Sequence, residues 1–161
     1  EMIWSKSFPL GASRLLQKLS PSDPVSQKDI RKLYDFLNDE LSELKFQFAD
    51  TPLNLIGSSG SFETFADMIA LEINKEHQKP AQTAVRLDPN DLHELIEQLI
   101  RSNHGERIKM NGLPFYRVDT IVFSGLMTRW FINNFQTTTV WTSYRSMKEG
   151  VIADLIDNQE K

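Results

Sequence analysis

The sequence predicts a single α/β domain, residues 1–161, in which a mixed sheet is flanked by helices. Short runs of β-branched and apolar residues alternate along the chain with longer segments whose apolar residues recur at helical spacing. Such alternation is typical of a largely parallel or mixed sheet that is covered by helices on both faces. The length of 161 residues fits one domain and is enough to bury a core without disulfides or a structural metal.

The composition excludes several kinds of site and argues against several kinds of partner. There is no cysteine, which rules out a disulfide framework, a thiolate metal site and a cysteine nucleophile. The formal net charge of -4 gives no overall basic field that would attract nucleic acid or anionic lipid. No apolar run approaches the ~20 residues that span a bilayer, and residues 1–6 lack the features of a signal peptide. We therefore expect a cytoplasmic protein that binds neither nucleic acid nor membrane.

The first third of the chain predicts an extended segment and two helices. Residues 2–10 are expected to be extended, and residues 12–19 to form a short helix. Ser26, followed three residues later by Asp29, is typical of a capping box and predicts that a longer helix begins there. Apolar residues at the 3.6-residue period continue this helix to Leu44, so one face is buried.

The middle of the chain predicts a strand, a turn and a second helix. Residues 53–56 are expected to form a short strand, residues 57–61 a turn, and residues 62–73 a helix. We interpret residues 74–86 as a connection.

The next helix has a clear predicted start. Asp88 is expected at the N-cap and Pro89 at the first helical position. Regularly spaced leucines and isoleucines follow, and the helix is expected to end near residues 103–105.

The last third of the chain predicts two strands and two helices. Residues 119–123 are expected to form a buried strand that ends at Ser124 and Gly125, before a helix over 126–135. Residues 137–141 predict a β-branched strand, and residues 148–150 lead into a final helix.

The turn that follows the strand at 53–56 has the composition of a phosphate-binding loop. It consists of Gly57, Ser58, Ser59, Gly60 and Ser61. The glycines allow the backbone to approach an anion closely, the start of the next helix offers free N–H groups, and the serines offer hydroxyl donors. Several such bonds, each worth roughly 1.5–3 kcal/mol to a charged oxygen, would hold a phosphate. A flexible turn with Ser61 as the N-cap explains the pattern equally well.

No residue is assigned a catalytic or metal-binding role from the pattern alone. The three histidines fall in different predicted elements and lack metal-ligand spacing. Glu63 and Glu149 stand at helix starts, where they complement the helix dipole. Gly125 is better explained by close helix packing than by a ligand. Isolated basic residues could neutralise phosphate but are usually solvated; they are Lys6, Arg14, Arg117 and Lys148.

Four segments, in this order, resemble the second domain of the exopolyphosphatase / guanosine-pentaphosphate phosphatase family. Residues 7–15, S-F-P-L-G-A-S-R-L, are similar to the family's S-x-P-L-G-x-x-R-L strand and bend. Residues 56–61 resemble its G-x-S-G-T turn, with serine in place of threonine at 61. Residues 112–125 resemble G-L-x-x-x-R-x-D followed by a strand and a glycine, and residues 145–151 are similar to x-x-L-R-E-G-V.

The resemblance implies an actin-like ATPase (ribonuclease-H-like) fold of two duplicated domains, of which this chain is the C-terminal one. Family members use magnesium to hydrolyse phosphoanhydrides, releasing terminal phosphate from polyphosphate or converting guanosine pentaphosphate to tetraphosphate. Phosphate lies in the cleft between the domains. The resemblance therefore implies that residues 57–61 form part of the cleft wall, and that Gly125, Lys148, Glu149 and Gly150 also lie in the cleft.

The chain departs from the family pattern in what it lacks. Nothing in it resembles the D-I-G-G-G-S-x-E phosphate loop that opens the family's second domain, or the D-x-G-S-N-S loop and catalytic glutamate of the first. Lys148 stands where the family favours arginine, and it lacks the planar fork that grips phosphate. We therefore expect Mg²⁺ to serve the full-length parent, and this chain alone to be inactive and to bind no metal.

A structural consequence follows from the absent first strand. In this fold that strand lies in the middle of the sheet, so its absence leaves backbone groups unpaired and apolar faces uncovered. We expect the chain to compensate by forming a homo-oligomer or by rearranging its strand pairing.

Three functional hypotheses are open. The first is a phosphoanhydride hydrolase whose partners are polyphosphate or guanosine polyphosphate and the parent's N-terminal domain. The second is a non-catalytic module of the same fold that binds phosphate or a nucleotide. The third is a purely structural or dimerisation domain.

Overall fold

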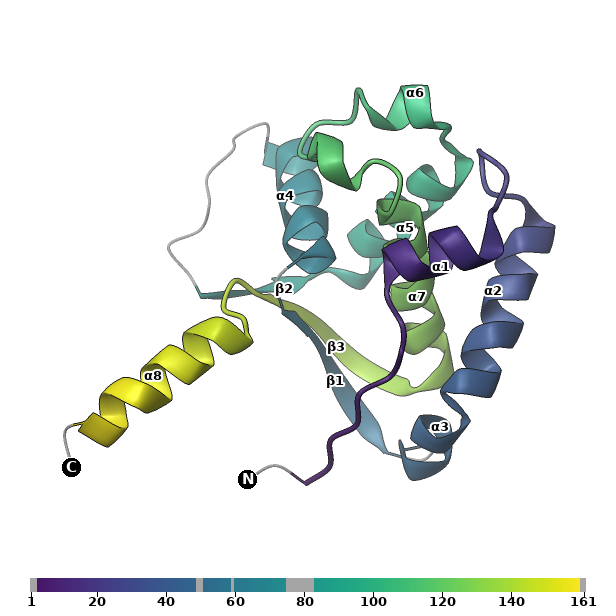
Figure 1. Cartoon of the computed structure of the whole chain (residues 1–161). Helices are drawn as coiled ribbons and strands as arrows, with labels where there is room; N and C mark the ends of the chain where they lie inside the picture. Colours follow the sequence, from purple (N-terminus) through teal and green to yellow (C-terminus); the bar gives the residue numbers. More distant parts are fainter. Residues whose placement is uncertain (1–2, 49–50, 59, 75–82, 160–161) are drawn as a thin grey trace.

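The structure, a computed structural model, describes residues 3–48, 51–58, 60–74 and 83–159 of the chain. Figure 1 shows a group of helices packed on a small sheet, with the last helix projecting away from them. In chain order the elements are α1 (Ala12–Leu19), α2 (Gln27–Glu40), α3 (Ser42–Phe48), β1 (Pro52–Ser58), α4 (Ser61–Asn74), β2 (Ala84–Leu87), α5 (Pro89–Arg101), α6 (His104–Arg107), the 3-10 helix η1 (Phe115–Arg117), α7 (Ile121–Asn134), β3 (Gln136–Ser143) and α8 (Met147–Gln159).

The sheet is mixed, as the sequence predicts. Within the described residues it has three strands in the order β1-β3-β2, with β3 parallel to β1 and antiparallel to β2. Ser58 at the end of β1 pairs with Ser143 at the end of β3. Because the two strands are parallel, the turn that leads into α4 and the loop that leads into α8 leave the same edge of the sheet.

Helices from the described part of the chain cover one face of the sheet and leave the other exposed. Among the described residues, α4 and α7 are the helices with substantial contact to the sheet. Leu55 and its partner Val140 face inward, and Val140 is buried. The next pair, Ile56 and Trp141, points to the opposite face, where Ile56 is 64% exposed. The expectation of helices on both faces is therefore not met within the described residues.

Helices α5, α1 and α2 pack around α4 and α7. Helix α5 packs on both of them, α1 packs on α7, and α2 packs on α1. The side chains between these helices form one core, whose largest fully buried members are Trp130, Phe65, Phe123, Leu15, Leu33, Leu37, Leu41, Leu92, Ile96, Leu99, Ile121 and Leu126.

Most of the predicted elements are confirmed. Ser26 caps α2, because its Oγ accepts a hydrogen bond from the Asp29 backbone N–H at 3.2 Å. Asp88 caps α5, with Pro89 at the start of that helix. The predicted helices at 12–19 and 62–73, the strands at 53–56 and 137–141, and the final helix are also present.

The predicted buried strand at 119–123 is wrong, because Ile121 already begins α7. This helix is surrounded by core, so the whole stretch from Ile121 to Leu126 is buried. A short run that is apolar on all sides fits a buried helix as well as a buried strand, and periodicity cannot separate the two.

Other parts of the chain also differ from the prediction. The connection predicted over 74–86 contains strand β2, which pairs with the last half of β3; residues 75–82 of that connection lie outside the described residues. The helix predicted from Ser26 to Leu44 is divided at Leu41, which ends α2 before α3 begins. Residues 3–10 form no strand.

Candidate functional site

The candidate site is the turn between β1 and α4. Gly57 and Ser58 are the last residues of β1, and Ser61 is the first residue of α4. Ser59 lies outside the described residues. Gly60 has a φ of 65°, a left-handed conformation that glycine adopts without strain.

Gly60 occupies the position that begins α4. Its carbonyl oxygen accepts hydrogen bonds from the backbone N–H of Thr64 and from the Thr64 hydroxyl, both at 3.3 Å. The Thr64 N–H is therefore the first donor of the helical ladder, and the N–H groups of residues 61–63, which come before it, have no intrahelical acceptor and carry the positive end of the helix dipole. The alternative hypothesis placed Ser61 at the N-cap, whereas the structure places Gly60 there.

Packing requires a residue without a side chain at position 57. A Cβ on this residue would lie 1.9 Å from Cγ of the Phe62 ring, so the ring occupies the space of a side chain. Its neighbour across the sheet, Thr142, is fully buried, and its hydroxyl has no hydrogen-bond partner among the described residues. The end of β1 is thus closed by the first turn of α4, and backbone approach to a ligand is left to Gly60.

Ser61 ties the turn to α7. Its Oγ donates a hydrogen bond to Oγ of Ser124 at 2.7 Å, and Ser124 in turn donates to the Thr120 carbonyl at 3.3 Å. The Ser61 hydroxyl proton is therefore engaged within the protein. What remains for an anion is the helix N-terminus and the exposed Ser58.

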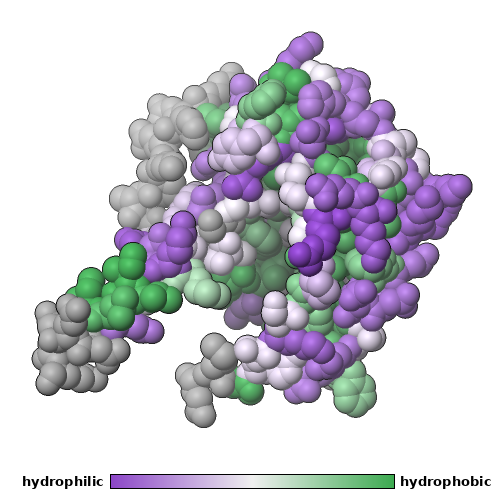
Figure 2. All heavy atoms as spheres, viewed as in Figure 1, coloured by the Kyte–Doolittle hydropathy of each residue, from purple (hydrophilic) through white to green (hydrophobic). Residues whose placement is uncertain are grey.

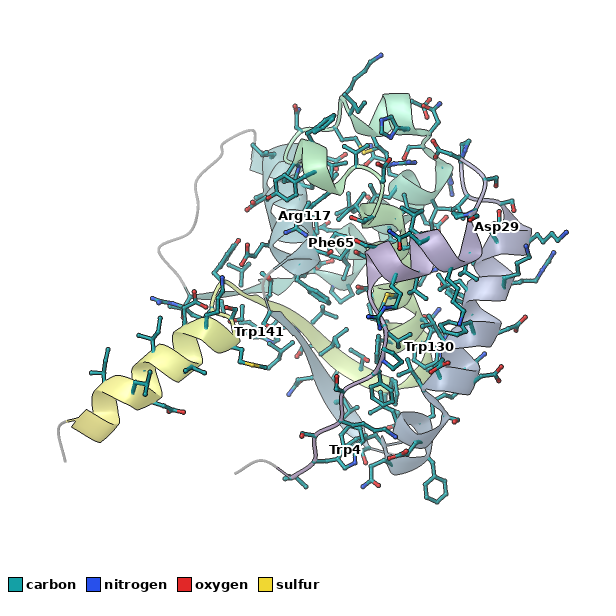
Figure 3. The ribbon with its side chains drawn as sticks, in the orientation of Figure 1. Trp4, Asp29, Phe65, Arg117, Trp130 and Trp141 are labelled. Atoms are coloured by element: carbon teal, nitrogen blue, oxygen red, sulfur yellow. The ribbon has the colours of Figure 1, made fainter. Side chains whose placement is uncertain are left out.

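Arg117 supplies a positive charge beside this turn. Its Nη1 lies 3.7 Å from the position that a Cβ on Gly60 would occupy. Arg117 is half-buried, and its guanidinium has no ion-pair partner among the described residues. Figure 3 shows Arg117 at the start of α4, close to Phe65. A partly desolvated guanidinium that has no protein carboxylate beside it attracts an external anion.

The segment before α7 holds Arg117 in this position. Gly112, with φ 80°, lets the chain approach α4 so closely that a Cβ there would lie 3.0 Å from the backbone of Met68. Leu113 and Val118 are buried on either side of η1. The buried Arg107 donates from Nε to the Val118 carbonyl at 2.9 Å. Arg117 therefore projects from a firmly held turn.

Two carboxylates of α4, those of Glu63 and Asp67, lie near Tyr144, the residue that follows β3. Burial raises the pKa of the Tyr144 hydroxyl, and the carboxylates of Asp67 and Glu63 raise it further. Glu63 stands in the first turn of α4, where its charge complements the helix dipole as expected.

Gly125 lies within α7 and faces α5. A Cβ added to it would lie 3.4 Å from Cγ1 of Ile96, and the residue is buried. Its neighbour Ser124 faces the turn, but Gly125 itself contributes to the packing of α7 on α5.

Lys148, Glu149 and Gly150 belong to the first turn of α8. They leave the sheet at the same edge as the turn, but Lys148 and Gly150 are exposed and a Cβ on Gly150 would meet no atom within 4 Å. Glu149 accepts hydrogen bonds from the hydroxyl and the backbone N–H of Ser146, at 2.5 Å and 2.7 Å, and these bonds lower its pKa to about 2. The Glu149 carboxylate is therefore engaged with Ser146 at the N-terminus of α8.

The described residues contain no metal cluster and no membrane span. Within them, no group of three or more carboxylate or histidine side chains could hold a metal ion. His104 is paired instead with Asp119, Nδ1 to Oδ1, at 2.7 Å. The helices of the described chain are also too short or too polar to cross a bilayer.

The sequence pattern located the turn but not its neighbours. Arg117 was only one of four isolated basic residues, and Ser124 was placed at the end of a strand that does not exist. The family-like segment at 112–125 contains both, and it would have identified them if it had been read as a single packed unit.

Comparison with known proteins bears on the fold and on the family. The profile of the Ppx/GppA phosphatase family matches residues 1–159. Exopolyphosphatase 1 of Mycobacterium leprae is 25% identical over 155 residues, which are 95% of this chain and 45% of that protein. Exopolyphosphatase 1 of Mycobacterium tuberculosis H37Rv is also 25% identical and is covered to 44%. The chain thus spans a little under half the length of these curated relatives.

Solved structures show the same fold. An exopolyphosphatase from Cytophaga hutchinsonii matches with a TM-score of 0.91 at 28% identity, over 98% of this chain and 51% of that one. An Aquifex aeolicus member of the Ppx/GppA family matches with a TM-score of 0.80 at 19% identity, over 97% of this chain and 49% of that one. The predicted actin-like, ribonuclease-H-like fold is confirmed.

Proposed function

This chain belongs to the Ppx/GppA phosphatase family, and from that premise we propose that it supplies a phosphate-binding wall to the cleft of a phosphoanhydride hydrolase. The relatives that it matches are named exopolyphosphatases. Because the chain spans about half of their length, the proposed reaction belongs to a longer protein that contains a second half.

One observation carries the proposal: the guanidinium of Arg117, which has no ion-pair partner in the part of the chain that the structure describes, lies beside Gly60 and the N-terminus of α4. The helix end offers backbone donors and a partial positive charge, and arginine offers a permanently charged planar fork. The glycine leaves room for an oxygen atom between them. Phosphate oxygens match this combination of donors.

The chain contributes binding, and we assign it no catalytic residue and no magnesium ligand. The Glu149 carboxylate accepts hydrogen bonds from Ser146 at the N-terminus of α8. The described residues contain no cluster of metal ligands. Mg²⁺ is proposed to serve the whole enzyme.

Calorimetric titration with tetrapolyphosphate tests the binding site. Arg117→Gln removes a charge-assisted contact and is expected to weaken binding roughly 10- to 150-fold. Arg117→Lys keeps the charge but loses the fork, so an intermediate loss is expected. Arg31→Gln, which removes an exposed charge from α2, is the matched control and should bind like the wild type. Unchanged binding by Arg117→Gln would refute the site.

A phosphate-release assay separates the enzyme proposal from its alternative, a non-catalytic binding module. The full-length protein should release phosphate from polyphosphate or from guanosine pentaphosphate when a divalent metal is present, and this chain alone should bind without release. If the full-length protein binds these compounds but never releases phosphate, the binding module is the correct assignment.

A further inference from the structure

Two exposed aromatic rings stand next to the proposed phosphate site. Phe115 and Tyr116 form η1 together with Arg117 and are 80% and 76% exposed. Single exposed apolar residues are normal on protein surfaces. Two adjacent rings, each about three-quarters exposed, contribute little to the core and therefore call for another explanation.

The rings are exposed on a well-anchored turn. Pro114 precedes η1 and fixes its own φ, while Leu113 and Val118 are buried on either side. Gly112 packs closely against the backbone of α4, and Arg107 donates a hydrogen bond to the Val118 carbonyl. A rigid scaffold that presents exposed side chains is typical of a binding surface.

The rings and the phosphate site are joined through Arg117. Its guanidinium carbon Cζ lies 5.2 Å from the centroid of the Tyr116 ring, and its Nη1 lies beside Gly60. An aromatic face, a guanidinium and a helix N-terminus thus follow one another over a short distance. The first offers stacking to a planar group, and the other two offer charge to phosphates.

We propose that Tyr116, flanked by Phe115, stacks on the base of a nucleoside polyphosphate whose phosphates lie between Arg117 and the start of α4. This inference rests on the proposed function, and it makes Tyr116 a residue that determines specificity. An inorganic polyphosphate has no planar group and would leave both rings unused. A nucleotide uses every part of the surface, since bases stack readily on tyrosine and phenylalanine.

The test compares two ligands with equal numbers of phosphoryl groups, guanosine 5′-tetraphosphate and inorganic tetrapolyphosphate. Both are titrated calorimetrically into the chain at one salt concentration. We expect the nucleotide to bind roughly 5- to 150-fold more tightly, the factor that one stacked base contributes. Tyr116→Leu should remove most of this advantage, so that the ratio of the affinities for the two ligands falls toward one.

Two variants control the measurement. Tyr116→Phe retains an aromatic face and should keep the preference for the nucleotide. Phe46→Leu removes an aromatic ring that is 88% exposed on α3 and should behave like the wild type. Because both substituted residues are mostly exposed, each variant is expected to fold, which circular dichroism would verify.

The outcomes distinguish this inference from the function on which it rests. If the wild type binds both ligands equally, or if Tyr116→Leu keeps the preference, base stacking is refuted while the phosphate site stands. If neither ligand binds the wild type, the phosphate site fails and the inference fails with it. A preference that Tyr116→Leu abolishes and Tyr116→Phe retains supports both.

Discussion

At the scale of single residues, the two glycines of the turn have different structural roles. Gly57 makes room for a protein ring, Phe62, whereas Gly60 supplies a left-handed backbone and an open approach. The sequence predicted the position of the turn from its glycines and serines. It could not assign these separate roles, because they depend on which neighbours fold over each residue.

Gly57→Ala should therefore destabilise the protein. The new Cβ would overlap the Phe62 ring, and overpacking of this kind costs about 1–3 kcal/mol. Urea unfolding would measure the loss. Gly150→Ala is the control: this glycine is exposed within α8 and a Cβ there meets no atom within 4 Å, so the free energy of unfolding should not fall.

A double-mutant cycle gives the cause of that loss. If the ring is responsible, Phe62→Ala should relieve most of the cost of Gly57→Ala, and the two substitutions should not be additive. Strict additivity would show that the loss comes from another source, such as the backbone of β1.

At the scale of elements, the starts of the capped helices were predictable and a buried helix was not. The caps at Ser26 and Asp88 depend on a few adjacent residues, so the sequence alone identifies them. Helix α7 is surrounded by core, and its apolar run carries no periodicity to distinguish it from a strand. Strand β2 has only four residues, and it is fixed by pairing with β3.

The start of α2 should make stability depend on pH. The Asp29 carboxylate accepts hydrogen bonds from the Ser26 hydroxyl at 2.6 Å, and from the backbone N–H and the hydroxyl of Ser22 at 3.1 Å and 2.9 Å. These bonds hold the pKa of Asp29 well below its ordinary value. A lowered pKa means that the contribution is present above the unfolded pKa, about 4, and is lost as pH falls toward the folded one.

Asp29→Asn should consequently lower the free energy of unfolding near neutral pH, and the difference from the wild type should shrink on acidification. Urea unfolding at a series of pH values measures both effects. Asp35→Asn, on the exposed side of the same helix, should show neither. A difference between Asp29→Asn and the wild type that stays constant with pH would contradict the assignment.

At the scale of the whole molecule, the described residues leave apolar surface exposed on the sheet and on the last helix. Ile56 is exposed on the uncovered face of the sheet. Helix α8 projects from the body, and Figure 2 shows hydrophobic residues gathered on it. Its exposed apolar residues are Met147, Val151, Ile152, Leu155 and Ile156. Exposed apolar surface of this extent is typical of an interface.

We expect the isolated chain to associate with itself through the apolar residues of α8. The sequence also predicts a homo-oligomer, because the first strand of the family's second domain is absent. In a protein of the length of the relatives, the second half would be available to cover the apolar residues of α8. Light scattering over a concentration series should show a rising mass for the wild type. The variant Ile152→Lys/Ile156→Lys should stay monomeric, because buried lysines in an apolar interface are costly.

Asp154→Asn provides the control on the same helix, since it leaves the apolar residues in place and should associate like the wild type. A wild-type chain that remains monomeric at every concentration would contradict the expectation of self-association.

The order of the strands also bears on how the protein is made. The central strand β3 is the last of the three in the chain, and both neighbours pair with it. At ribosomal rates of about 5–20 residues per second, β1 emerges on the order of ten seconds before its partner. During that interval its edge is open to other chains, so nascent molecules need protection that the finished fold does not.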